Sequence, residues 1–223
     1  MLKLKSALVV ALVLTGLTAC STDDAEQDAP QADITRIHTL GEGFGPEFKV
    51  TEVPKAGIDP RLFESQPIPP GLTFDPPECD QFGSNRLLEP GLQGNMAAIT
   101  AEGEGNRFIA IALETSEPIS LNKPADNCKR VTFDGPNAGG VVENVESPQI
   151  DGAETVGTHR TLETRFAGQQ PNRGEVFSYV ASFDNYAVIV TANPLVLPDQ
   201  PVEPVDTERA RNLLVDAVDA VRG

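Results

Sequence analysis

The segment that most constrains the fold of this chain is residues 175–192. In its first half, apolar and polar side chains alternate at period two, as in a strand with one buried face. Asp184-Asn185 then suits a two-residue turn, because both residues tolerate left-handed backbone geometry. Residues 186–192 return as an apolar strand that we expect to be buried on both faces. The segment therefore predicts a β-hairpin, with these side chains of its first strand in the core: Phe177, Tyr179, Ala181 and Phe183.

Two further pairs of extended segments have turn residues between them. Residues 96–101 and 107–114 flank a Gly- and Asn-containing stretch that predicts a hairpin with a loose loop. Residues 129–133 and 141–145 flank a second loop rich in Gly, Pro and Asn. Residues 155–165 also alternate, but neither face is strongly apolar, so we expect this strand at a sheet edge or next to solvent.

An amphipathic helix is predicted at the C-terminal end. Asp206 can cap it, and apolar residues then recur at spacings of three and four. A membrane-surface helix is the alternative, but the polar face mixes acids and bases instead of being basic. We therefore expect an α+β domain, with an antiparallel sheet of about five to seven strands and this helix packed on it. The apolar positions are Ala210, Leu213, Leu214, Ala217, Val218 and Val221.

The N-terminus resembles a bacterial lipoprotein signal. Lys3 and Lys5 precede a short apolar run, and Leu17-Thr18-Ala19-Cys20 is similar to a lipobox. The resemblance implies that residues 1–19 are a signal peptide and that Cys20 carries a diacylglyceryl group, with two chains that anchor the protein stably to the outer face of the cytoplasmic membrane. The alternative, an uncleaved membrane helix with an incidental cysteine, needs a longer apolar stretch.

The mature chain is predicted to have three parts. Residues 20–33 are polar and predict a disordered tether. Residues 34–77 are rich in Pro and Gly and have one possible strand at 48–53 and, at most, a helical turn near 61–64. Residues 78–223 are long enough for a single core domain, which would begin with a short helix.

If the thiol of Cys20 carries the lipid, two cysteines remain in the exported chain, Cys79 and Cys128. A disulfide between them is favoured in an oxidising compartment. In the chain-entropy model such a bridge stabilises the fold by about 4 kcal/mol. A metal pair or a reactive thiol is the alternative, but neither cysteine has another cysteine nearby. The chain has two histidines, His38 and His159.

Charge excludes one class of partner. The chain has 17 basic and 33 acidic residues and a formal net charge of −16, and signal cleavage would remove two lysines and no acid. This balance argues against nucleic acid as a partner. It fits a soluble surface or, less simply, capture of a cationic partner or divalent ions, although no calcium-loop spacing is present.

Catalytic motifs are absent from the sequence: there is no nucleophile elbow, Walker motif or dinucleotide fingerprint. His159 could serve as a base for Ser178 or Ser182, but it lies mid-strand in a polar pattern. Paired carboxylates for glycoside hydrolysis are conceivable, but no Trp and two Tyr leave little aromatic surface for sugar stacking. We expect no catalytic residue, cofactor or metal.

The string Phe74-Asp75-Pro76-Pro77-Glu78-Cys79, followed by a second cysteine and a terminal amphipathic helix, is similar to an actinobacterial lipoprotein family, the domain-of-unknown-function family 5642. More distantly, the layout resembles the extracellular sensor domains of mycobacterial serine/threonine kinases. Those domains are disulfide-bonded antiparallel sheets with two bridges, whereas this chain can form one. The resemblance implies an envelope location and an α+β fold, and no catalytic residue.

Two functional hypotheses follow. The first is a non-enzymatic module that captures an envelope ligand or protein in a groove between sheet and helix. The second is an envelope hydrolase with an unrecognised carboxylate or Ser/His site. A structural spacer is a third possibility and predicts neither site.

Overall fold

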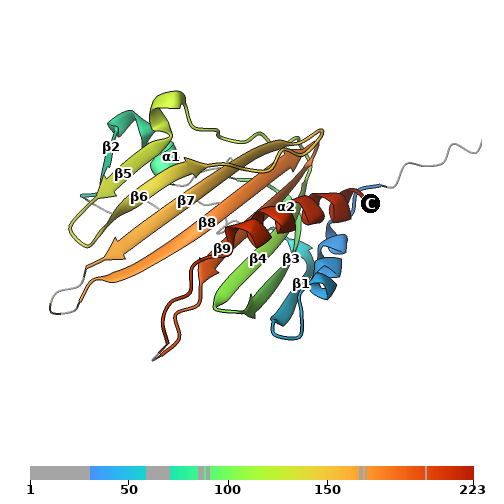
Figure 1. Cartoon of the computed structure of the whole chain (residues 1–223). Helices are drawn as coiled ribbons and strands as arrows, with labels where there is room; N and C mark the ends of the chain where they lie inside the picture. The colour runs from blue at the N-terminus through green and yellow to red at the C-terminus, as the bar shows by residue number, and fades with distance from the viewer. Residues whose placement is uncertain are drawn as a thin grey trace, which may run out of the picture.

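The computed structural model describes residues 31–58, 71–84, 88, 91–165, 168, 170–198 and 200–223. Within these residues, nine strands form one antiparallel sheet in the order β1-β3-β4-β9-β8-β7-β6-β5-β2 (Figure 1). The predicted α+β class is confirmed, but the prediction of five to seven strands was too low. The strands are β1 (Lys49–Gly57), β2 (Thr73–Asp75), β3 (Gly94–Gly103), β4 (Asn106–Thr115), β5 (Arg130–Asp134), β6 (Ala138–Val145), β7 (Glu154–Thr164), β8 (Asn172–Phe183) and β9 (Tyr186–Pro194).

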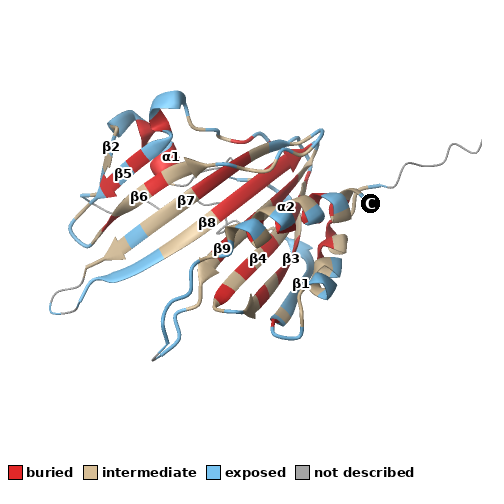
Figure 2. Cartoon of the chain, in the orientation of Figure 1, coloured by how far each residue is buried: buried red, intermediate tan, exposed pale blue. Residues whose placement is uncertain are grey.

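Helix α2 (Thr207–Arg222) covers one face of the sheet, as the sequence predicted. The Asp206 side chain accepts a hydrogen bond from Arg209 N at 2.9 Å, which caps the first turn. All six predicted apolar positions of the helix are buried, and Figure 2 shows the buried strand segments beneath it. Small side chains on the sheet leave room for the helix backbone to approach closely. They are Ala97, Ala101, Ala110, Ala112, Ala181 and Ala192.

Two hairpins form the centre of the sheet. β8 and β9 are joined at Asp184, which has a φ of 48°, and the predicted core side chains of β8 pack in the α2 core. β3 and β4 are joined by Glu104 and Gly105, both at positive φ. The predicted loose loop there is wrong, since register pairing continues to Gly103 and Asn106 and leaves a two-residue turn.

β7 was expected at a sheet edge or next to solvent, and the edge position is wrong, because β7 lies between β6 and β8. Val156 is buried in the core on the face opposite α2. The polar side chains that suggested an edge are matched by partners on neighbouring strands, such as His159 by Glu175. Cross-strand pairing therefore takes the role that apolar burial usually has in an inner strand.

A second core lies on the sheet face away from α2. It contains Val131, Val142 and Val180 together with the disulfide Cys79–Cys128, whose Cα atoms are 5.5 Å apart. The predicted disulfide is thus present, and both cysteines are buried. Three short helical segments lie along this part of the chain: η3 (Pro77–Cys79), α1 (Asp80–Gly83) and η4 (Asp126–Cys128).

The predicted Pro- and Gly-rich segment 34–77 contains more structure than expected. The predicted strand is present as β1, but a 3₁₀ helix, η1 (Ile34–Gly43), precedes it, and Ile34 and Ile37 are fully buried. β1 forms one edge of the sheet, and β2, which is last in the sheet order, pairs with β5 at the opposite edge. The signal peptide, Cys20 and the predicted helical turn at 61–64 lie outside the described residues. No helix in the described ranges is long and apolar enough to cross a membrane.

Candidate binding site

The sheet extends beyond α2 and presents a polar surface there. α2 contacts β4, β8 and β9, whereas β5, β6 and β7 lie further along the sheet (Figure 1). Glu143, His159 and Phe177 are paired neighbours on β6, β7 and β8, so their side chains share a face. Because Phe177 packs against the α2 core, Glu143 and His159 lie on the α2 side of the sheet.

His159 connects three strands through both of its ring nitrogens. Its Nε2 lies 2.8 Å from Glu175 Oε2, and its Nδ1 lies 3.9 Å from Glu143 Oε2. The imidazole stacks on Phe177 with ring centroids 4.0 Å apart. Glu143 in turn pairs with Arg130. The ring is therefore held in place by two carboxylates and one aromatic face.

The structure does not bring His159 to either candidate serine. Ser178 and Ser182 alternate with the β8 residue that pairs with His159, so their side chains point to the opposite face. His38 also lies elsewhere, with its Nε2 2.9 Å from the carbonyl oxygen of Val53. In the described parts of the chain, no group of three or more His, Cys, Asp or Glu side chains is placed to hold a metal ion.

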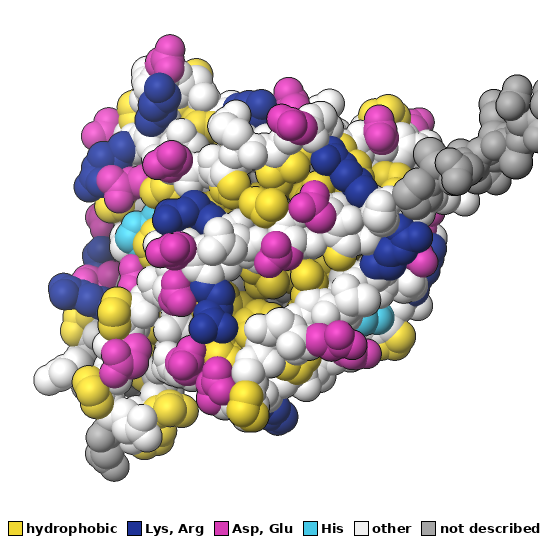
Figure 3. All heavy atoms as spheres, turned by 45° about the vertical axis from the view of Figure 1, so that its right-hand side comes forward, with side chains coloured by type: hydrophobic (Ala, Val, Ile, Leu, Met, Phe, Trp, Pro, Cys, Tyr) yellow, Lys and Arg dark blue, Asp and Glu magenta, His cyan; other side chains and the backbone are white. Residues whose placement is uncertain are grey.

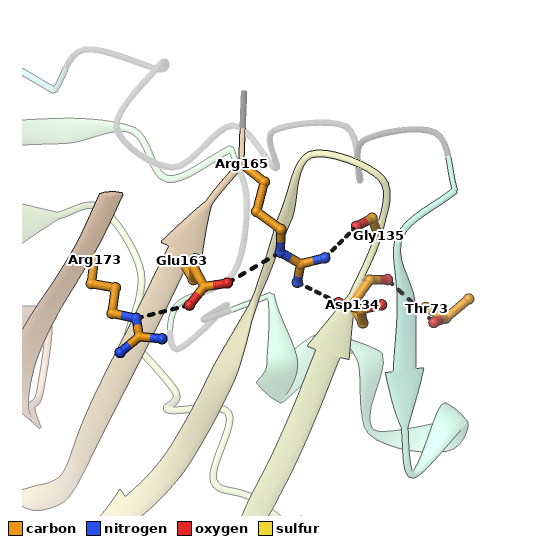
Figure 4. A network of polar contacts seen from close by, with 6 residues as sticks. All are labelled: Thr73, Asp134, Gly135, Glu163, Arg165 and Arg173. Carbon is orange, nitrogen blue, oxygen red and sulfur yellow. Dashed lines mark hydrogen bonds and ion pairs between the residues drawn. The ribbon is translucent and has the colours of Figure 1, made fainter. Parts of the chain in front are cut away.

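A second ionic network crosses the ends of β5, β7 and β8 (Figure 4). Arg165 donates to Asp134 at 2.6 Å and to Glu163 at 3.3 Å. Glu163 also accepts from Arg173 Nε at 2.8 Å. The hydrogen bond from Arg165 lowers the pKa of Asp134, and that from Arg173 lowers the pKa of Glu163. Both carboxylates therefore remain ionised at neutral pH, each with an arginine partner.

This network borders a hollow of about 950 Å³ at the strand ends. Part of the lining is the ionic network, and part is the segment that leads from β9 toward α2. The exposed apolar side chains of this segment that line the hollow are Val196 and Val202, which are 72% and 55% exposed. Leu162 points to the face opposite Glu163, because neighbouring strand residues alternate. Exposed apolar side chains that meet in a concavity beside charged groups are typical of a ligand site.

Two glycines in the lining lie on different faces of the sheet. A Cβ at Gly139 would clash with Arg165 Nη2 and lie 2.8 Å from Asp134 Oδ1, so the absence of a side chain leaves space for that ion pair. A Cβ at Gly174 would meet nothing within 4 Å. Gly174 pairs with Leu162, so an added side chain there would point away from Glu163 and Arg173.

Arg160 lies outside this ionic network. It pairs with Val176 and is three positions along β7 from Glu163, so its side chain points to the face opposite Glu163 and Arg173. Its guanidinium carbon is 4.9 Å from the ring centroid of Phe133, a residue of the core on that face. Burial lowers the pKa of Arg160, although the group stays protonated at neutral pH. We therefore assign this cation to the packing of the core opposite α2.

A smaller hollow of about 550 Å³ lies between η1 and α2. Its arginine, Arg209, is already engaged, since it pairs with Asp206 at 3.4 Å and Glu104 at 3.2 Å. The guanidinium of Arg209 also covers the Phe48 ring at 4.8 Å. These contacts join α2 to the sheet, so we assign this region to the fold and the strand-end hollow to binding.

The family model named Domain of unknown function (DUF5642) matches residues 33–222. The chain belongs to the DUF5642 family. A solved structure of an uncharacterized Mycobacterium smegmatis protein, an Rv0999 ortholog, is 59% identical, with 87% of this chain and all of that chain covered and a TM-score of 0.81. No curated protein matches the chain.

Sequence reasoning located the cysteine pair of this DUF5642 chain but missed the hollow. Cys79 and Cys128 form the bridge, whereas Cys20 lies outside the described residues. The available signal was the polar alternation of residues 155–165, which we interpreted as an edge strand. That pattern in fact marks the inner strand on which Glu163 joins the ionic network of the hollow.

Proposed function

We propose that this protein is a lipid-anchored envelope protein that binds a small amphipathic molecule and does not catalyse a reaction. The observation that carries the proposal is the meeting of the exposed apolar side chains Val196 and Val202 with an ionic network at one hollow. A ligand that covers these side chains removes their apolar surface from water. Full burial of one such side chain contributes roughly 1.5–3 kcal/mol to the free energy of binding. The adjacent ionic network can orient the polar part of the ligand.

The surface around the site supports a small ligand over a large cationic partner. In the view of Figure 3, acidic and basic side chains are interspersed, with hydrophobic atoms between them. A protein partner attracted by the acidic excess would be favoured by a continuous patch of one sign. The mixed pattern supports solubility as the role of the net charge, with recognition left to the hollow.

Anchoring at Cys20 would leave the hollow accessible. Asp33 N donates to Val221 O at 2.8 Å, so the described chain begins beside the C-terminal end of α2. The hollow involves the segment before α2, which leads to the other end of that helix (Figure 1). A helix of this length spans roughly 24 Å. The tether would therefore leave the domain on the side away from the proposed site.

A variant that combines Val196→Ser and Val202→Ser tests the proposal, because it removes the exposed apolar side chains that line the hollow. Nile red, a neutral dye that fluoresces in apolar sites, is titrated into the wild-type protein and the variant. We expect saturable binding to the wild type and an affinity lower by about tenfold or more in the variant, since it loses the apolar contact surface of the dye.

Val53→Ser is the matched control. Val53 is also an exposed apolar side chain, at 40%, and it does not line the hollow. We expect this variant to bind the dye as the wild type does. Absence of dye binding to the wild type, or equal loss in both valine variants, would contradict the proposed site.

A further inference from the structure

We infer that Asn106 is a positioning residue for the hollow, an inference that rests on the proposed function. The exposed apolar wall of the hollow lies on the connection from β9 to α2, at Val196 near its start and Val202 near its end. The tight turn between β3 and β4 holds the connection close to both places. Asn106, the first residue of β4, fixes the end that carries Val202.

The side chain of Asn106 binds main-chain atoms with both ends of its amide. Its Nδ2 donates to the carbonyl oxygens of Glu104 at 3.2 Å and Pro204 at 3.3 Å. Its Oδ1 accepts from Asp206 N at 3.2 Å. The residue is 4% exposed, so loss of the amide would leave buried main-chain groups without a partner. An amide offers donors and an acceptor together, which neither a carboxylate nor an apolar side chain does.

The start of the connection is held by the residue before Asn106. Leu195 N donates to Gly105 O at 2.7 Å. Gly105 has a φ of 73°, and a Cβ there would lie 2.6 Å from Glu203 Cγ and 2.7 Å from Glu203 Cβ. The connection therefore packs directly against the main chain of the turn. Two adjacent residues of the turn thus hold both ends of the connection, next to the apolar wall.

The connection is also stiff by composition. It has prolines at positions 194, 198, 201 and 204, and each proline fixes its own φ angle. A wall that is ordered before the ligand arrives does not lose conformational entropy on binding. Asn106 does not line the hollow. It therefore raises ligand affinity through the position of Val202 and not through contact with the ligand.

Asn106→Leu tests this role, because it keeps most of the side-chain volume and removes the amide. The wild type and the variant are compared by NMR relaxation and by Nile red titration. We expect backbone order parameters at Glu203 and Val205, on either side of the bonded Pro204, to fall from about 0.85 to below about 0.6. We expect the affinity for the dye to fall by about fivefold.

Thr115→Val is the matched control at the other end of the same strand. Thr115 is also a buried polar residue, 7% exposed, and its Oγ1 donates to two main-chain carbonyls, those of Glu117 at 2.7 Å and Asn185 at 3.1 Å. It does not line the hollow. We expect both variants to lower the unfolding midpoint, and only Asn106→Leu to change the order parameters of the connection and the dye affinity.

Gly105→Ala is a second variant, which keeps the inference testable if Asn106→Leu does not fold. The Cβ of Glu203 is attached to the main chain, so a methyl group at Gly105 displaces the connection itself. Gly152→Ala is its control, because Gly152 is also at positive φ, 66°, and an added Cβ would come no closer than 3.6 Å to Arg222. We expect a fivefold loss of dye affinity, roughly, in Gly105→Ala and no change in Gly152→Ala.

The outcomes separate the inference from the proposed function. Dye binding to the wild type with unchanged affinity and order parameters in Asn106→Leu would overturn the positioning role and retain the binding site. Equal loss of affinity in Asn106→Leu and Thr115→Val would reduce Asn106 to a contributor to stability and would overturn the role as well. Absence of dye binding to the wild type would contradict the proposed function, and the role in binding with it.

Discussion

Replacement of both Cys79 and Cys128 by alanine is expected to lower the free energy of unfolding by about 4 kcal/mol, measured by urea denaturation. The bridge closes a loop with a sequence separation of 49, so its loss increases the conformational freedom of the unfolded chain. Both cysteines are buried in the core opposite α2. The bridge ties the segment before β3 to the start of β5, where no long helix is present among the described residues.

Reductant provides the control for this prediction. The wild type in reductant should approach the stability of the double alanine variant, and reductant should not change the variant itself. A change below about 1 kcal/mol in both comparisons would contradict a structural role of the bridge, because loss of a native disulfide typically costs 2–5 kcal/mol.

Cys20→Ala is expected to abolish membrane association of the protein in its native host. The two acyl chains proposed for Cys20 would anchor the protein stably, since each buried methylene contributes roughly 0.8 kcal/mol. Intact mass spectrometry of the membrane fraction should show a wild-type chain that begins at Cys20 and carries acyl mass. The variant should lack that mass and leave the membrane fraction.

The double alanine variant at Cys79 and Cys128 is the control for lipidation, because it should retain the acyl mass. A wild-type chain with its first 19 residues still present and three free thiols under non-reducing conditions would contradict both the lipoprotein and the disulfide assignments. The masses measured before and after alkylation distinguish the processed, disulfide-bonded chain from the unprocessed chain with free thiols.

Local sequence patterns predicted the elements whose structure depends on neighbouring residues. The α2 stripe from Ala210 to Val221 was correct at every position, because helical spacing alone places these side chains on one face. The β8–β9 hairpin was correct for a similar reason, since alternation and Asp184 define its register and turn.

Elements that depend on distant partners were missed. β2 has three residues and forms because β5 supplies its hydrogen bonds. η1 is placed by burial of Ile34 and Ile37 against the sheet and α2, in a segment with few other apolar residues. The inner position of β7 likewise depends on partners such as Glu175, which no local pattern identifies.

The candidate site could not be predicted from the sequence for the same physical reason. Glu163 and Val202 are far apart in the chain, and the sheet register with the β9–α2 connection brings them to one hollow. The sequence did indicate a module without catalytic motifs, and this expectation remains a prediction.

The most direct test of the central claim is a titration of isotope-labelled protein with decyl glucoside, a neutral single-chain amphiphile, followed by amide chemical shifts. We predict that the largest shifts fall on residues 161–165 and 172–175 and on Val196 and Val202. Shifts confined to the region between η1 and α2, at residues 39–44 and 206–216, would contradict the strand-end hollow as the binding site.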